Sequence, residues 1–237
     1  MPWVKDIYNV ANQSKAIYDF DKLANRYDDW YCSATGQMYD KLEKKAFEKL
    51  LTNYSSGKQF LEIGCGTGHW SKFFSERGFE VTGIDISEEM IKTANRKNMP
   101  RCHFQVADGQ NLSFFDNSFD AATAVTTLEF SEKPQRIISE MARCVKPEGR
   151  LFFGVLNSLS SCNQKRQNNA ESVYAYGQFL SPEQLKNMLE RFGTVKMRIS
   201  GFVIRSEWLI WLSPFWELLC RTTGCEKGAF IAAEVRL

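Results

Sequence analysis

The chain has 237 residues, enough for one large α/β domain with a substantial core. Its 30 basic and 28 acidic residues leave a formal charge of +2, so composition gives no electrostatic case for a nucleic-acid partner. The seven cysteines are scattered without a CxxC pair, which predicts a reduced, cytoplasmic protein with no metal site.

The N-terminal part of the chain predicts helices. The first residues contain no apolar core and do not form a signal peptide. Residues 17–31 carry aromatic and aliphatic side chains at helical spacings, and a second helix is predicted over 37–51. We therefore expect 1–51 to form a helical segment ahead of the sheet.

Residues 60–70 read FLEIGCGTGHW, an apolar run followed by alternate glycines. This pattern predicts a buried strand that turns tightly into a helix near Thr67, with backbone amides exposed to a ligand. A dinucleotide site needs glycine at the first, third and sixth positions, but the sixth position counted from Gly64 is His69. Glu62 would also repel a pyrophosphate. A cationic ligand is therefore favoured.

A second predicted strand, residues 80–87, contains an acid near its end. Asp85 follows the first glycine of the turn by about 20 residues, and a carboxylate there can accept both hydroxyls of a ribose. We therefore expect Asp85 to bind a ribose, the alternative being a plain acid ahead of the Ser87 helix cap. A third strand, 102–107, leads into Asp108 and Gly109.

The sequence from Glu62 to Gly68 resembles the first signature of class I S-adenosylmethionine (SAM) dependent methyltransferases, acid-x-Gly-x-Gly-x-Gly. In that family the glycine turn contacts the amino-acid end of SAM and the acid lies beneath it. The resemblance also implies that Asp108 accepts a hydrogen bond from the adenine amino group, although Asp-Gly is a common turn pair in any protein. The cofactor-binding residues that we expect are Glu62, Gly64, Cys65, Gly66, Thr67, Gly68, Asp85, Ile86, Asp108, Gly109 and Thr126.

Residues 118–130 resemble the fourth-strand signature of the same family. Thr126 and Glu129 stand at its carboxyl end, the edge at which ligands bind in such sheets. Glu129 occupies a place where many relatives carry histidine, so it is the candidate catalytic residue, as a base or as a partner that orients the acceptor. The alternative is a solvated loop acid. The motif of nucleic-acid amino-group methylases is absent after this strand, which favours a small-molecule acceptor.

Two further segments are expected near the substrate. Residues 17–31 resemble the N-terminal helix of small-molecule methyltransferases, including the ubiquinone and menaquinone biosynthesis enzymes, where it often folds over the cofactor. Tyr27 and Tyr31 are therefore candidate lid residues, with core packing as the alternative. The polar segment 157–179 is too long for a plain connection and predicts a substrate-side insertion with Tyr174 and Tyr176 as candidates.

The remaining elements complete the predicted fold. Helices are expected over 135–146, 181–192 and 207–220, and strands over 151–156, 195–203 and 229–237. The whole chain, 1–237, is predicted to be a single class I methyltransferase domain with 1–51 as its N-terminal lid. The fold class is α/β, with a Rossmann-like seven-stranded, mostly parallel sheet, an antiparallel last strand, and helices on both faces.

Apolar residues crowd several faces of the predicted helix over 207–220. Ser213, Pro214 and Glu217 interrupt the stretch, so it cannot span a bilayer. The candidates for covering it are the substrate pocket, a second subunit of a homodimer and the membrane interface. We favour the pocket, so Trp208 and Trp211 are candidate substrate residues. A monomer is equally compatible with the sequence.

The combined patterns predict a SAM-dependent enzyme that methylates a small, apolar or aromatic acceptor and releases S-adenosylhomocysteine. Two alternatives from other classes stay open, a SAM-binding protein without methyl transfer and a nucleotide-cofactor oxidoreductase. A third use of the cysteines, binding of a thiophilic metalloid as in the arsenite methyltransferases, lacks a recognisable ligand spacing.

Overall fold

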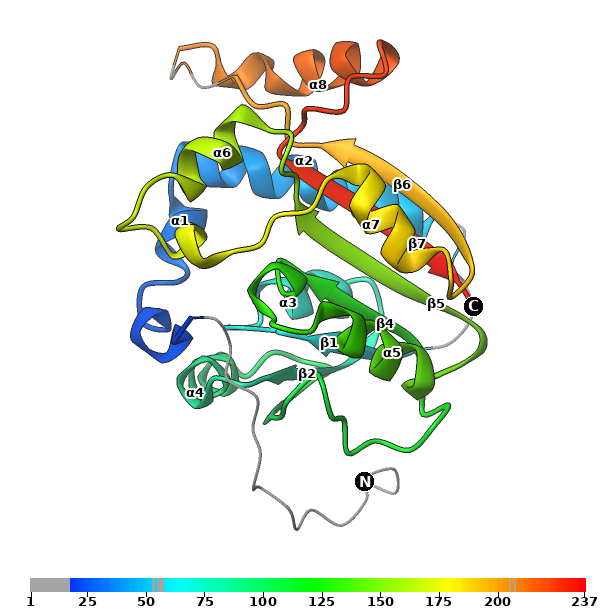
Figure 1. Ribbon diagram of the computed structural model, residues 1–237. Helices are drawn as coiled ribbons and strands as arrows, with labels where there is room; N and C mark the ends of the chain where they lie inside the picture. Colours follow the sequence, from blue (N-terminus) through cyan, green and yellow to red (C-terminus); the bar gives the residue numbers. More distant parts are fainter. Residues whose placement is uncertain (1–17, 53, 55–57, 205, 207) are drawn as a thin grey trace.

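The computed structural model describes residues 18–52, 54, 58–204, 206 and 208–237. The predictions for residues 1–17 and for Glu207 lie outside the described residues. Seven strands form one sheet in the order β3-β2-β1-β4-β5-β7-β6 (Figure 1). The strands are β1 (Gln59–Ile63), β2 (Glu80–Asp85), β3 (Cys102–Val106), β4 (Phe119–Val125), β5 (Val145–Leu156), β6 (Thr194–Ser200) and β7 (Phe230–Arg236).

The pairing directions confirm the predicted fold class. Strands β1 to β5 pair in parallel, whereas β7 runs antiparallel to both of its neighbours, β5 and β6. Strand β5 begins earlier than predicted. Val145 already pairs with Phe119, the next three residues are exposed, and regular pairing resumes at Arg150 opposite Ala121. Residues 146–149, which lie at the end of the predicted helix 135–146 and before the predicted strand 151–156, therefore form an irregularity inside the strand.

Helices cover both faces of the sheet (Figure 1). The α-helices are α1 (Asp29–Cys32), α2 (Ala34–Leu51), α3 (His69–Ser75), α4 (Glu88–Arg96), α5 (Pro134–Cys144), α6 (Ser161–Gln167), α7 (Pro182–Leu189) and α8 (Ser213–Thr222). The short 3-10 helices are η1 (Phe20–Leu23), η2 (Leu128–Phe130), η3 (Val173–Tyr176) and η4 (Ile210–Leu212).

Two hydrophobic cores lie on opposite faces of the sheet. One core joins α2 and α3 to Phe152 of β5, and the other joins α5 and α7 to Leu151 and Phe153 of the same strand. Neighbouring residues of a strand point to opposite faces, so β5 supplies both cores. The sheet is thereby buried on both sides and only its edges and strand ends are available for binding.

Three predicted segments differ from the structure. Residues 17–31 do not form one helix within the described part; they form η1 and α1, joined by turns. The polar segment 157–179, over which no helix is predicted, contains α6 and η3. The C-terminal helix expected over 207–220 is divided into η4 and α8.

Two further properties concern the described part of the chain. None of its helices combines the length and the apolar character that crossing a bilayer requires. It also brings together no group of three or more His, Cys, Asp or Glu side chains suited to a metal ion.

The docking of α2 on the sheet can be tested at Phe47. Its side chain is fully buried and its ring lies 4.9 Å from that of Trp70, centroid to centroid. Because Phe47→Ala leaves a cavity between helix and sheet, we expect the free energy of unfolding to fall by about 3–5 kcal/mol in a urea titration. The exposed Lys49→Ala in the same helix is the control, expected within about 0.5 kcal/mol of the parent. An equal, small effect of both would show that α2 is not part of the core.

Candidate cofactor and active site

The turn after β1 has the backbone that its glycines predict. Gly64 and Gly66 have φ values of 68° and 52°, in the left-handed region that glycine favours. A Cβ atom at Gly64 would lie 2.3 Å from Oγ1 of Thr127, so a larger residue is excluded there. The amide of Cys65 donates to the carbonyl of Ile84 at 2.9 Å, which fixes the turn against β2.

Asp85, at the end of β2, holds the same turn through its side chain. Its Oδ2 accepts a hydrogen bond from the Gly66 amide at 2.8 Å, and its Oδ1 accepts one from the Ser87 amide at 2.9 Å. Burial raises the pKa of Asp85, although these amide bonds act in the opposite direction. The carboxylate therefore lies at the junction of the turn and the start of α4.

Glu62 lies beneath the turn. Its side chain is buried, and Oε2 accepts a hydrogen bond from the Ser71 hydroxyl at 2.5 Å. Burial raises the pKa of Glu62 to about 8, and the nearby charge of Asp85 contributes in the same direction. A cation bound above the turn would favour the ionised form of this carboxyl group.

A cavity opens above these groups, with about 710 Å³ of empty space that includes the open solvent at its mouth. Eight of the predicted site residues line it: Tyr27, Gly64, Gly66, Asp85, Ile86, Asp108, Gly109 and Thr126. Its lining does not include Glu62, Cys65, Thr67, Gly68, Glu129, Tyr31, Tyr174, Tyr176, Trp208 or Trp211. The sequence interpretation missed the lining residues Phe20, Ile63, Met90, Ala107, Gln110, Thr127, Phe130, Ser131 and Ile137.

Some of the missed residues had a signal in the sequence. Phe130 and Ser131 directly follow Glu129 at the carboxyl end of β4, where ligands were already expected. Phe20 is two helical turns before Tyr27 and shares its helical phase. Met90 and Ile137 resemble ordinary core positions of amphipathic helices, and no sequence pattern distinguishes them.

Thr126 lies in the cavity wall, directly after the end of β4. Its φ is 49°, a region that β-branched residues rarely adopt, and its amide donates to the Gly154 carbonyl at 2.7 Å. Such a conformation costs about 1–3 kcal/mol and is held by its surroundings. The neighbouring Thr127 hydroxyl donates to the carbonyl of Ile63 at 3.1 Å, which links β4 to the glycine turn.

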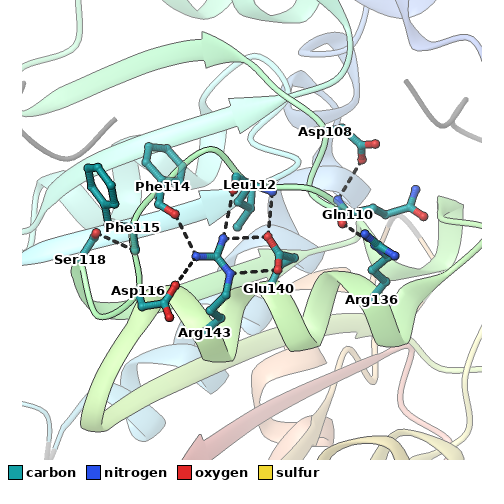
Figure 2. Close-up of polar contacts among 10 residues, drawn as sticks. All are labelled: Asp108, Gln110, Leu112, Phe114, Phe115, Asp116, Ser118, Arg136, Glu140 and Arg143. Atoms are coloured by element: carbon teal, nitrogen blue, oxygen red, sulfur yellow. Dashed lines mark hydrogen bonds and ion pairs between the residues drawn. The ribbon is translucent and has the colours of Figure 1, made fainter. Parts of the chain in front are cut away.

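The loop that follows β3 forms another wall and is held by α5 (Figure 2). The carboxylate of Asp108 accepts a hydrogen bond from the Gln110 amide at 2.8 Å, and Nε of Arg136 donates to the Gln110 carbonyl at 2.8 Å. The chain at Asp108 to Gln110 is therefore fixed by its own turn and by a helix side chain.

Arg143 of α5 holds the next part of this loop (Figure 2). Its guanidinium donates to the carbonyl of Leu112 at 3.0 Å and to that of Phe114 at 2.9 Å. It also pairs with Glu140 at 2.8 Å and with Asp116 at 2.7 Å. Glu140 in turn accepts a hydrogen bond from the Leu112 amide at 2.8 Å. The planar guanidinium thus connects helix and loop through several bonds at once.

Residues 18–31 contribute Phe20 and Tyr27 to the cavity wall and are attached at two points. The carboxylate of Asp21 accepts a hydrogen bond from the Ser87 hydroxyl at 2.5 Å. Asp28 accepts one from the Thr67 hydroxyl at 2.7 Å and pairs with Lys97 at 2.6 Å. Burial acts to raise the pKa of Asp28, but the bonds to Lys97 and Thr67 outweigh it and the pKa is lowered. Asp28 therefore stays ionised and attached at neutral pH.

Tyr27 lies directly over the glycine turn. A Cβ atom built on Gly66 would lie 3.8 Å from its ring, and its hydroxyl interacts with the side chains of Thr126 and Tyr31. The Tyr31 ring stacks on that of His69 with centroids 3.5 Å apart. The structure therefore brings both tyrosines to the cofactor side, with only Tyr27 in the cavity wall.

Glu129 is fully buried just outside the cavity lining. Its Oε1 accepts a hydrogen bond from the Leu156 amide at 2.5 Å. Its Oε2 has no hydrogen-bond partner among the described residues. Burial raises the pKa of Glu129 to about 7. The expectation of a solvated loop acid thus does not describe this side chain.

The other candidate substrate residues are dispersed. Tyr174 lies near Glu129, Glu43 and Arg166, whose charges act on its hydroxyl. Tyr176 is exposed, with its ring 5.2 Å from that of Tyr18. Trp208 and Trp211 are 87% and 67% exposed on the C-terminal segment, and the structure does not bring them to the cavity.

The residues present suit a bound SAM molecule. The cavity lies at the carboxyl ends of parallel strands, the edge at which ligands bind in such sheets. The glycines of the turn carry no Cβ atoms that would block a ligand from its backbone, and two acids with raised pKa, Glu62 and Asp85, would compensate a positive charge. Apolar residues such as Phe20 and Met90 provide walls for a planar base.

Comparison with known proteins supports the same assignment. The model of a methyltransferase domain matches residues 61–153. A ubiquinone biosynthesis O-methyltransferase of Coxiella burnetii is 30% identical over 208 residues, covering 81% of this chain and 88% of that protein. An uncharacterised protein of Methanocaldococcus jannaschii is 31% identical over 188 residues, covering 78% of this chain and 85% of the other.

A solved structure agrees with these relatives. A SAM-dependent methyltransferase of Thermotoga maritima, described as a possible histamine N-methyltransferase, superimposes with a TM-score of 0.72 at 26% identity. The match covers 92% of this chain and 97% of that structure. Taken with the glycine turn, the acid at the end of β2 and the sheet order, these matches show that the chain belongs to the class I SAM-dependent methyltransferases and uses SAM as its cofactor.

Proposed function

We propose that this methyltransferase modifies a hydroxyl group on a small acceptor with an apolar or aromatic body. The observation that carries the proposal is the buried carboxylate of Glu129, whose Oε2 has no partner among the described residues. A buried carboxylate oxygen without a donor is costly, so a donor on a bound molecule would stabilise it. Glu129 does not itself line the cavity but directly precedes the lining residues Phe130 and Ser131, so the acceptor would reach it once binding opens this part of the wall. A hydroxyl group is such a donor and is also a methyl acceptor.

The surroundings of Glu129 support an aromatic acceptor. Tyr27, Tyr31 and Tyr174 lie within electrostatic range of one another, and burial raises the pKa of each phenol. The guanidinium of Arg166 lies 5.2 Å from the centre of the Tyr174 ring. Rings of this kind offer apolar faces and polar edges, which together suit a hydroxylated aromatic molecule.

The similarity to relatives supports transfer to oxygen. The Coxiella burnetii protein is named as an O-methyltransferase of ubiquinone biosynthesis, and it aligns with most of this chain. The Thermotoga maritima structure is described as a possible N-methyltransferase, so the comparisons do not agree on the acceptor atom. Glu129 favours oxygen, because a carboxylate with a pKa of about 7 can accept a hydroxyl proton near neutral pH.

We propose that different residues of the site bind different parts of SAM. Asp85 would accept the ribose hydroxyls, Asp108 the adenine amino group, and the amides of the glycine turn would contact the amino-acid end. SAM itself supplies an activated methyl group with a neutral leaving group. The remaining work of the chain is to exclude water and hold the acceptor oxygen in line, which Tyr27 and the segment around it are placed to do.

A screen with methyl-labelled SAM tests the proposed function. The purified protein is incubated with fractions of a cell extract, and labelled products are separated by size and polarity. We expect label in small apolar or aromatic molecules, with S-adenosylhomocysteine formed in equal amount. Label found only in protein or nucleic acid would contradict the proposal.

Asp85→Ala tests the ribose assignment. The substitution removes a charged acceptor, which is worth about 1.5–3 kcal/mol, so the dissociation constant of SAM should rise roughly 10- to 150-fold. Titration calorimetry measures this directly. Glu80→Ala, at the opposite end of the same strand, is the matched control and should bind SAM as the parent does. An unchanged affinity of Asp85→Ala would refute the role of Asp85.

Arg143→Lys tests whether α5 positions the adenine-side loop. A lysine keeps the charge but cannot bond to Leu112, Phe114 and Glu140 in one plane. We expect SAM binding to weaken by about tenfold, since the loop carrying Asp108 would lose its fixed position. Arg101→Lys, in the partly exposed pair with Glu80, is the control. Equal affinities of both variants would mean that the loop is held without Arg143.

Glu129→Gln tests the role of the buried acid. The raised pKa means that Glu129 is protonated below about pH 7 and ionised above it, so activity that needs a base should rise with pH through this range. In Glu129→Gln, kcat should fall by about 10² to 10⁴ and lose this rise. The exposed Glu132→Gln should keep the parent profile. A parental pH profile in Glu129→Gln would exclude the base.

A further inference from the structure

The C-terminal segment around α8 exposes an apolar surface. It lies along one end of the molecule, apart from the sheet (Figure 1). Its large exposed side chains are Trp208, Leu209, Trp211, Phe215, Trp216, Leu218 and Leu219. Scattered apolar residues are normal on a protein surface, but so many within one short segment are typical of a patch that contacts another phase or molecule.

The orientation of α8 is the reverse of that of an ordinary surface helix. The side chains buried against the protein are Ser213, Glu217 and Cys220, at the helical spacing of one face. The Ser213 hydroxyl accepts a hydrogen bond from the Ile204 amide at 2.9 Å, and Glu217 accepts one from the Phe202 amide at 3.0 Å. Polar bonds therefore dock the helix, and its apolar face is turned outward.

The outward face does not serve the methyl-transfer cavity. None of the exposed aromatic residues of this segment is part of the cavity lining. The pocket that the sequence favoured for Trp208 and Trp211 therefore does not cover them, and the patch needs a different partner.

We propose that this segment binds the surface of a lipid bilayer, with α8 lying in the interface. Three of the six tryptophans of the chain lie here, and the indole ring, apolar with one polar N–H, prefers the boundary between headgroups and acyl chains. Because α8 lies along the end of the molecule, its length can meet a flat surface (Figure 1).

The charges around the patch complement a lipid surface. Between Trp208 and Thr223 the only acid is Glu217, which is buried, and the only base is Arg221. Burial raises the pKa of Glu217, and the charge of the exposed Lys45 of α2 acts on it in the opposite direction, so a second positive charge lies near α8. Anionic headgroups would be attracted and no exposed acid within this stretch would repel them. The inference is independent of the acceptor proposed above.

Co-sedimentation of the full chain with vesicles tests the proposal. Vesicles of phosphatidylcholine alone, and of equal parts phosphatidylcholine and phosphatidylglycerol, are compared. We expect binding to both and tighter binding to the anionic vesicles. The triple variant Trp208→Ser, Trp211→Ser, Phe215→Ser should lose at least about tenfold in partition. Phe115→Ser, at an exposed apolar residue remote from α8, should bind as the parent does.

Two further measurements distinguish membrane binding from self-association. Brominated lipids should quench the tryptophan fluorescence of the parent more than that of Trp208→Ser, a single change at the most exposed side chain, which does not endanger folding. Sedimentation velocity without lipid measures self-association. Absence of vesicle binding by the parent would overturn the proposal. A lipid-free dimer that the triple variant abolishes would also overturn it, because a second copy would then cover the patch.

Discussion

The hydrogen bond between the Asp85 carboxylate and the Gly66 amide is the contact on which the site depends. It joins the end of β2 to the turn after β1, and the amide of Cys65 adds a second link to the same strand through Ile84. The register of these two parallel strands therefore sets where the turn presents its amides. A buried sheet cannot slip by one residue without reversing every side chain, so the position is fixed by both hydrophobic cores.

Three acids with raised pKa values lie around the site. Glu62 lies beneath the turn, Asp85 lies beside it, and Glu129 lies beyond the cavity wall, and burial raises the pKa of all three. Each carboxylate is costly in the protein without a compensating charge or donor. A cation bound near Glu62 and Asp85, as proposed for the cofactor, would offset that cost, and cofactor binding and the stability of the fold would then be linked.

The sequence predicts the parts of the site that depend on local patterns. Asp85 follows a short apolar run, and that run already identifies the end of a strand. Other parts depend on distant bonds. The polar helix α6 is held by Asn163, which donates to the carbonyl of Ala229 at 2.7 Å, and Arg143 holds carbonyls of a loop about 30 residues away. Neither bond has a local signature. Trp208 was assigned to a pocket because apolar patterns normally indicate burial, whereas polar docking turns this segment outward.

The two attachments of residues 18–31 have a consequence for turnover. Asp21 bonds to the first residue before α4, and Asp28 bonds to the glycine turn, so this segment is tied to the same elements that are proposed to hold the cofactor. In the proposed lid role of this segment, exchange of spent for fresh cofactor would break these bonds and form them again in each cycle. A few polar contacts would then set the speed of opening, and the pace of catalysis could be adjusted there without altering a group that touches the methyl acceptor.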